Sequence, residues 1–285
     1  MSHNTAVTVY RHDGPAEVLR KGGRLALRRT LRLPVVDDLC FRYSLRCLRD
    51  RQATERDAAD VLDTAYEFSG VGRYRTIAPI QVRSELADAV AFVGAQRPRT
   101  VLEIGTANGG TFYAWCRGID SVERAISVNL PRDLTPPAFL DRALPGVETH
   151  FVRGDSHTDA AYEAVVRRLD GDTVDLLFID GDHTFEGVRE DFERYAPLLS
   201  EDGLVAFHDI VTIERDTWNQ VDEFWATLAD DEDAVEFRAT AYDPHDPMTI
   251  SGTTVTGYGF GILRNPDVRA SDVGPAGPHV RSSQK

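Results

Sequence analysis

The chain has 285 residues, 42% of them hydrophobic and 9% aromatic, enough to bury the core of one large domain or two small ones. This composition excludes a mainly disordered chain and a small disulfide-stapled protein. The formal net charge of −14 argues against nucleic acid as the main partner. No run of about 18 apolar residues is present, so we expect no transmembrane segment. The polar start of the chain and three cysteines without zinc-pair spacing predict a cytoplasmic protein with reduced thiols.

Charge is spread unevenly along the chain. Residues 1–50 carry ten basic and five acidic side chains, whereas residues 201–250 carry two basic and fourteen acidic ones. Arginine supplies 30 of the 32 basic residues, a balance typical of a halophile-like, salt-adapted protein or of a genome rich in G and C. We expect the basic head to be a solvated helical face or to dock on the acidic body of the same or another subunit. A helical head of about 70 residues favours a homo-oligomer, a dimer or higher. A helix lying on a membrane surface around residues 25–33 is the alternative.

The pattern of apolar residues predicts helices first and alternating strands and helices afterwards. Residues 15–68 have helical spacing with a break at Pro34, and a further helix over 82–95 is capped by Ser84 or by the loop before it. From Thr100 onward the predicted strands cover 100–104, 125–129, 147–153, 174–180, 203–208, 235–239 and 257–263. The predicted helices between them cover 109–116, 158–169, 185–195 and 218–228.

This alternation predicts an α/β fold with a doubly wound, Rossmann-like sheet. The sheet is expected to be mostly parallel, with an antiparallel final hairpin, because only a polar loop joins the last two strands. We expect an arginine-rich helical head at 1–77, the main domain at 78–264 and a disordered tail at 265–285, where Pro, Gly and Ser are frequent.

Polar residues follow five of the predicted strands. The strand ends contain Glu103 and Gly105, then Asn129, then Asp155 and Ser156, then Asp180, Asp182 and His183, and last His208 and Asp209. In a doubly wound sheet, ligands bind beyond the carboxyl ends of the strands. The sequence therefore predicts that these five ends build one site.

The first strand end is a glycine-rich turn, with the sequence Glu-Ile-Gly-Thr-Ala-Asn-Gly-Gly-Thr at 103–111. Glycine lets the backbone approach a ligand closely, and the next helix offers free N–H groups there. Ala107 stands where a dinucleotide fingerprint has its second glycine. An acid at Glu103 suits a ligand with a positive charge and hydroxyl groups better than a pyrophosphate.

The pattern Glu-x-Gly-x-Ala-x-Gly at 103–109 resembles motif I of class I S-adenosylmethionine-dependent methyltransferases. Two further stretches, 178–192 with its Asp-Gly-Asp-His and 203–210 with its His-Asp-Ile, are similar to one branch of that family. The branch contains macrolide-sugar and aminocoumarin-sugar O-methyltransferases and cephalosporin-hydroxylase-like proteins. The resemblance covers about residues 78–263 and leaves the head uncovered.

The resemblance implies a binding site for S-adenosylmethionine. Glu103 would lie near the charged groups of the cofactor, and Asn129 stands where the family usually has an acid that grips the ribose hydroxyls. Asp155, with Ser156, would lie beside the adenine, and a cap of the following helix is the alternative role for Asp155. The residues expected to contact the cofactor are Glu103, Gly105, Ala107, Asn108, Gly109, Asn129, Asp155, Ser156 and Asp180.

The resemblance also implies a metal ion and a general base. Asp180 and Asp209, with His208 before the second acid, would hold Mg²⁺, or Mn²⁺ because His208 replaces the acid usual in the sugar methyltransferases. A hydrogen-bonded polar cluster without metal is the alternative. His183 matches the position proposed as general base, with His157 as the second choice. Asp182 is expected to cap the next helix.

Together these features predict a metal-assisted O-methyltransferase that uses S-adenosylmethionine and acts on a small hydroxylated acceptor, a sugar or glycoconjugate. The alternatives are a cofactor-binding partner protein without turnover and a metal-dependent hydroxylase that uses Asp180, His183 and His208. Candidates for the wall of the acceptor pocket are Tyr74, Arg75, Trp218 and Tyr242.

Overall fold

The computed structural model describes residues 33–131, 135–211, 218–229, 234–239 and 258–264. The predictions for most of the basic head, for the membrane-surface helix up to residue 32, for Tyr242 and for the tail lie outside these described residues.

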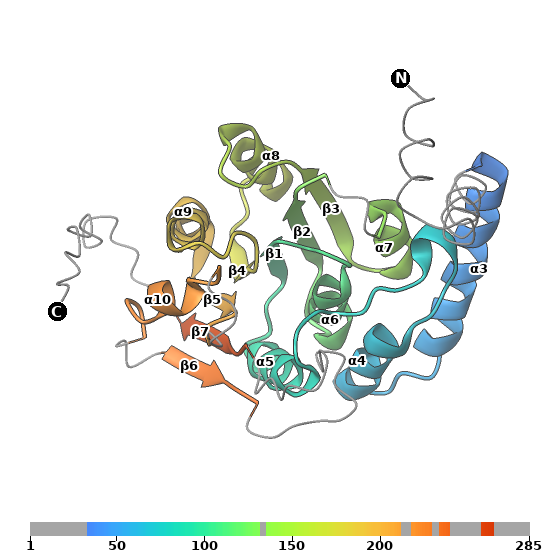
Figure 1. Cartoon of the computed structure of the whole chain (residues 1–285), viewed down its shortest axis with the longest axis horizontal. Coiled ribbons are helices and arrows are strands. Elements are labelled where there is room, and N and C mark those ends of the chain that lie inside the picture. The colour runs from blue at the N-terminus through green and yellow to red at the C-terminus, as the bar shows by residue number, and fades with distance from the viewer. Residues whose placement is uncertain (1–32, 132–134, 212–217, 230–233, 240–257, 265–285) are drawn as a thin grey trace, which may run out of the picture.

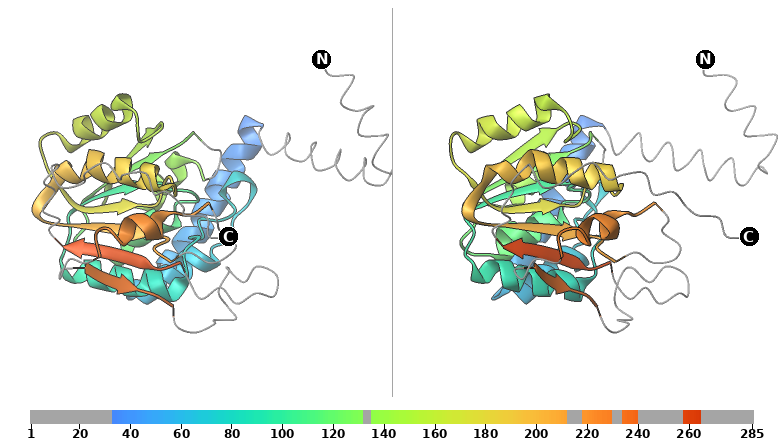
Figure 2. Two further views of the ribbon diagram at one scale, coloured as in Figure 1. Left: turned by 60° about the vertical axis from the view of Figure 1, so that its left-hand side comes forward. Right: turned by 90° about the vertical axis from the view of Figure 1, so that its left-hand side faces the viewer.

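Seven strands form one sheet in the order β3-β2-β1-β4-β5-β7-β6. All neighbours pair in parallel except β7, which pairs antiparallel with both β5 and β6. Figure 2 shows β7, in red, between these two strands. This confirms the predicted fold class with its antiparallel final hairpin. The strands are β1 (Thr100–Ile104), β2 (Arg124–Asn129), β3 (Glu148–Arg153), β4 (Val174–Ile179), β5 (Leu199–His208), β6 (Ala234–Phe237) and β7 (Phe260–Arg264).

Helices cover both faces of the sheet (Figure 1). The side with α8, α9 and α10 packs against Leu102, Leu177 and Phe207 of the sheet. The other side, with α4, α5 and α6, packs against Val101 and Phe178. The helices are α3 (Pro34–Gln52), α4 (Ala58–Glu67), α5 (Arg83–Ala95), α6 (Gly110–Gly118), α7 (Pro137–Ala143), α8 (Asp159–Leu169), α9 (Phe185–Tyr195) and α10 (Val221–Trp225), with short 3₁₀ turns at Gly72–Tyr74 and Ala196–Leu198.

The first two described helices share a core with the sheet. Leu48 of α3 and Leu62 of α4 are fully buried, in the same apolar cluster as Phe112 and Trp115 of α6. Pro34 starts α3 at its first turn, where a proline ring fits and its missing N–H costs nothing. The boundary at residue 77 stays a prediction, but residues 33–77 are packed on the main domain rather than held apart from it.

Some predicted element bounds were wrong. Helix α7 was not predicted, because its seven residues are too short for a clear helical period. Strand β5 begins four residues earlier than expected, and α10 covers only 221–225 of the predicted 218–228. Ser84 does not cap α5; the N-cap residue is Val82, which makes no side-chain cap bond.

Candidate active site

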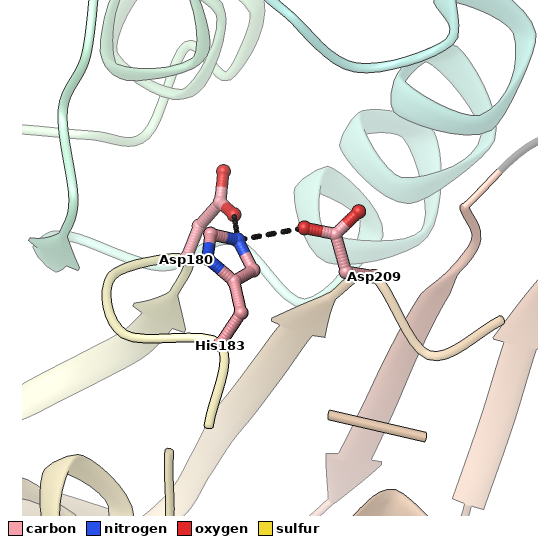
Figure 3. Close-up of side chains that lie close together, drawn as sticks. All are labelled: Asp180, His183 and Asp209. Carbon is pink, nitrogen blue, oxygen red and sulfur yellow. Dashed lines mark ion pairs between the residues drawn. The ribbon is translucent and has the colours of Figure 1, made fainter. Parts of the chain in front are cut away.

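The carboxyl ends of β4 and β5 bring four titratable side chains together: Asp180, His183, His208 and Asp209. Nε2 of His183 lies 2.7 Å from Oδ2 of Asp209 and 3.4 Å from Oδ1 of Asp180. Figure 3 shows the imidazole of His183 reaching between the two carboxylates. Nδ1 of His208 lies 3.2 Å from Oδ1 of Asp209 and 3.5 Å from Oδ1 of Asp180. These groups form one cluster because β4 and β5 are paired in parallel and end at the same edge.

The cluster has a donor set suited to a cation. One ligand atom from each of Asp180, His183 and Asp209 lies within 4.8 Å of the others. Two carboxylates and an imidazole suit Mg²⁺ less well than an all-oxygen set and suit Mn²⁺ better. The sequence predicts His208 as the third ligand and His183 as a base, whereas the geometry puts His183 itself among the three. The choice between the two histidines stays a prediction.

Both imidazoles are strongly influenced by the carboxylates. Burial alone would lower the pKa of His183, but its hydrogen bonds to Asp180 and Asp209 outweigh this and raise the pKa to about 10. For buried His208, the charges of Asp209 and Asp180 likewise overcome burial and raise the pKa to about 10. The pKa of Asp209 is lowered well below its usual value, because the two histidines outweigh its burial. Without a cation, His183 is therefore protonated at neutral pH and cannot accept a proton.

The backbone of Asp209 is held in an uncommon conformation. Its φ is +63°, in the left-handed region that costs a residue with a Cβ about 1–2 kcal/mol. Nδ2 of Asn219 donates a hydrogen bond to its carbonyl oxygen at 2.9 Å. The N–H of Gln220 donates to the carbonyl oxygen of His183 at 2.8 Å. The segment that precedes α10 is thus hydrogen-bonded to the loop that carries His183 and to the loop that carries Asp209.

Gln81 also belongs to the site. Its Nε2 donates a hydrogen bond to Oδ2 of Asp180 at 2.6 Å, and its Oε1 accepts one from the hydroxyl of Thr111 at 2.6 Å. Gln81 is buried just before α5. No motif marks a glutamine at this place, so only the fold could reveal the contact.

Glu103 is buried in the first strand end without a cationic partner. Its side chain is fully buried, and neither oxygen has a hydrogen bond of normal geometry within the described residues, although the hydroxyl of Thr106 lies near enough to act on it. Burial and the charge of Asp180 raise its pKa well above the usual value, and the hydroxyl of Thr106 opposes this only in part. A buried carboxylate of this kind is costly, so it fits a site where a cationic ligand is bound.

The glycine turn has a structural explanation of its own. Gly105 has a φ of +92°, and a Cβ there would overlap the backbone carbonyl of Asp180. Gly109, with a φ of +86°, is the N-cap residue of α6, so the free N–H groups of that helix begin there. Ala107 has a φ of +43°, which glycine would adopt at less cost. Asn108 donates from Nδ2 to the carbonyl oxygen of Ala78 at 3.3 Å.

The ends of β2 and β3 hold the other predicted cofactor residues. Asn129 is half-buried at the end of β2, and its carbonyl oxygen accepts the N–H of Gly154 at 3.0 Å. Asp155 does not cap α8, because Thr158 is the cap residue; Oδ1 of Asp155 instead accepts the N–H of His157 at 3.1 Å. The carbonyl oxygen of Ser156 accepts the hydroxyl of Tyr195 at 2.8 Å. Contact of these residues with a cofactor stays a prediction.

Other candidates are placed differently from what the sequence suggested. Nε2 of His157 lies 3.3 Å from Oδ1 of buried Asp191, so its ring is turned toward α9. Thr184, not Asp182, caps α9, while Oδ1 of Asp182 accepts the N–H of Thr184. Tyr74 is buried in the aromatic core against Phe41 and Phe139, which removes it from an acceptor pocket.

Arg75 and Trp218 are exposed. Of the two, Trp218 lies beside the ring of His183.

None of the helices in the described part of the chain has the length and apolar character needed to cross a bilayer.

Comparisons with known proteins give one family match and one curated relative. Residues 102–210 match the family model of a methyltransferase domain. The uncharacterized protein y4gI of Sinorhizobium fredii is 29% identical over 144 residues, which make up 48% of this chain but only 16% of that protein. The chain therefore spans about a sixth of the length of this curated relative.

Two solved structures are similar at low identity. An O-methyltransferase from Bacillus cereus in complex with SAH has 17% identity and a TM-score of 0.44, over 62% of this chain and 78% of that one. The O-methyltransferase TomG from Streptomyces achromogenes, in complex with SAM, has 17% identity and a TM-score of 0.43, over 79% and 97%. The family match supports a methyltransferase, and its residues 102–210 contain every strand end of the candidate site, from Glu103 to Asp209.

Proposed function

We propose that this chain is an S-adenosylmethionine-dependent O-methyltransferase assisted by a divalent cation, acting on a small hydroxylated acceptor such as a sugar or glycoconjugate. The observation that carries the proposal is the cluster of Asp180, His183 and Asp209 at the edge of a matched methyltransferase domain. The carboxylates of Asp180 and Asp209 would hold a cation, and the imidazole of His183, whose nitrogen lies within 4.8 Å of their oxygens, would take the proton of a hydroxyl group positioned there.

The residues of the first three strand ends fit the cofactor. A cationic ligand would give the buried carboxyl group of Glu103 the opposite charge that it lacks within the described residues. The N-terminus of α6 at Gly109 offers N–H groups to a carboxylate. Side-chain oxygens of Asn129 and Asp155 would bind hydroxyl and amino groups. When bound, S-adenosylmethionine supplies a methyl group on a positively charged sulfur, and that sulfur is the leaving group when an oxygen nucleophile attacks the methyl carbon in line.

The polar cluster would handle the acceptor proton. As the acceptor oxygen takes the methyl group and the sulfur keeps the electron pair of the broken bond, the hydroxyl proton would have to be taken up by a side chain of this cluster. The hydroxyl proton moves to Nε2 of His183, which must be neutral to accept it. A divalent cation held by Asp180 and Asp209 would offset their charge, lower the pKa of His183 from about 10 and acidify the hydroxyl group.

Calorimetry and a methyl-transfer assay test this proposal. We expect the purified chain to bind S-adenosylmethionine but not NAD, and to transfer labelled methyl groups to a small-molecule extract of the source cells. We expect chelation to abolish transfer and Mg²⁺ or Mn²⁺ to restore it. Absence of cofactor binding would contradict the whole proposal, whereas chelator-resistant transfer would contradict only the role of the cation.

A further inference from the structure

Trp218 is a large exposed side chain next to the candidate base. It is 56% exposed, and its ring lies edge-on to that of His183, with the ring centroids 5.0 Å apart and an interplanar angle of 87°. The other two tryptophans of the chain, Trp115 and Trp225, are buried. Exposure of an indole leaves much apolar area in water, which a ligand of matching shape would cover.

The position of Trp218 is fixed by the two residues that follow it. Asn219 donates from Nδ2 to the carbonyl oxygen of Asp209, and its Oδ1 accepts the N–H of Val221 at 3.0 Å. Gln220 donates its N–H to His183 and accepts the N–H of Phe185 at 3.1 Å. The backbone beside the indole is therefore bonded to both loops of the polar cluster. These bonds hold the chain next to Trp218 beside the loop that carries His183, where the two rings are in contact.

The geometry points to Trp218 as the residue that determines which acceptors are taken: hydroxylated rings with a flat apolar face. This inference rests on the proposed function. The apolar face of the ring would pack against the indole while a ring hydroxyl reaches His183 and Asp180. Sugars, through the C–H groups of one face, and phenols share this chemistry. An acyclic polyol has no rigid face to offer, so it would gain little from the indole.

Tryptophan fluorescence tests the contact without turnover. Because Trp115 and Trp225 are buried, acrylamide should quench mainly Trp218, and Trp218→Phe should remove the quenchable signal. The probes are methyl glucoside, resorcinol and glycerol, each added with S-adenosylmethionine and Mn²⁺. We expect at least one ring compound, but not glycerol, to protect Trp218. Protection by glucoside alone identifies a sugar acceptor, and protection by resorcinol alone identifies a phenol.

Kinetics with whichever ring compound is methylated provide the second test. We expect Trp218→Leu to raise KM about tenfold, equivalent to about 1.4 kcal/mol, with little change in kcat, while Trp218→Phe stays near the wild type. Val166→Ala, at an exposed apolar residue of α8, is the control. An unchanged KM in Trp218→Leu, or cofactor binding with no protection by either ring compound, would overturn the inference alone. Failure to bind cofactor would instead count against the proposed function.

Discussion

The side-chain amide of Gln81 donates a hydrogen bond to Asp180 at 2.6 Å, although the two residues lie 99 positions apart in the chain. One oxygen of Asp180 is thereby engaged by the segment before α5, and the other faces His183. Thr111 holds the amide of Gln81 in this orientation by donating to its oxygen. Three elements distant in sequence thus determine how one carboxylate is presented.

We expect Gln81→Leu to weaken Mn²⁺ binding about 10–100-fold, the usual effect of losing a partner that orients a metal ligand. Thr111→Val removes one of the two hydrogen bonds to the amide oxygen of Gln81, the other coming from the N–H of Ile80, and should have a smaller effect in the same direction. Titration calorimetry with Mn²⁺ measures both. Wild-type affinity in Gln81→Leu would show that Asp180 does not depend on this amide.

Asp180→Asn and Asp209→Asn should each remove most of the cation affinity, because an amide carries no charge. Asp182→Asn is the matched control. Asp182 lies in the same loop as Asp180, but its carboxylate accepts the N–H of Thr184 and does not join the cluster. We expect the control to bind Mn²⁺ normally. Equal loss in all three variants would point to damage of the loop instead of loss of ligands.

His183 should show a pH dependence that follows from its carboxylate partners. Its folded-state pKa of about 10 lies above the ordinary value of 6.5, so its protonation stabilises the cation-free fold below about pH 6.5, and this stabilisation is lost as the pH rises toward 10. Thermal unfolding with chelator should therefore show wild type and His183→Gln drawing closer in Tm between pH 6.5 and 10. A gap that widens with pH would contradict the assigned ion pairs.

The same histidine should govern turnover once a cation is present. We expect His183→Ala to lower kcat about 10²–10⁴-fold, the range for loss of a general base. The loss should shrink at high pH as the acceptor ionises unaided. Full activity in this variant with Mn²⁺ bound would show that another group accepts the proton, and His208 would be tested next.

Glu103→Gln should change the stability of the fold and the affinity for S-adenosylmethionine in opposite directions. A folded-state pKa well above the unfolded value means that the wild type loses stability as the pH rises above about 4.5, whereas the neutral amide does not. At pH 7.5 we expect the variant to be more stable by about 1–3 kcal/mol and to bind S-adenosylmethionine more weakly. Denaturant unfolding and calorimetry measure the two effects. A variant that is both less stable and unchanged in binding would contradict the role given to this carboxylate.

Much of the fold can be predicted from the sequence, because short apolar runs mark the strands, and strands that alternate with helices pair in parallel. The run from Val174 to Ile179 is buried on both faces, and its end must lie beside the end of the next parallel strand. That reasoning brings Asp180 and Asp209 together. It cannot tell which way a loop side chain turns, and His157 turns toward Asp191 instead.

Gly105 shows a second limit of sequence reasoning. A glycine in such a turn suggests close approach of a ligand, yet the group that excludes a side chain here is the carbonyl of Asp180 in the neighbouring loop. Gly105→Val would therefore disturb the fold as well as the cofactor site. Packing partners so distant in sequence, like Gln81 and Asp180, leave no local pattern to read.

The pairing of β4 with β5 has a consequence for how such a chain can change its substrates. The two carboxylate-bearing positions follow neighbouring strands, whose spacing of about 4.8 Å is a property of any sheet. An exchange of Trp218 itself would change the surface beside His183 without altering that spacing or the bonds that Asn219 and Gln220 make to the two loops. If Trp218 selects the acceptor as proposed, the choice of molecule and the chemistry at the strand ends depend on different residues, so one can change while the other stays.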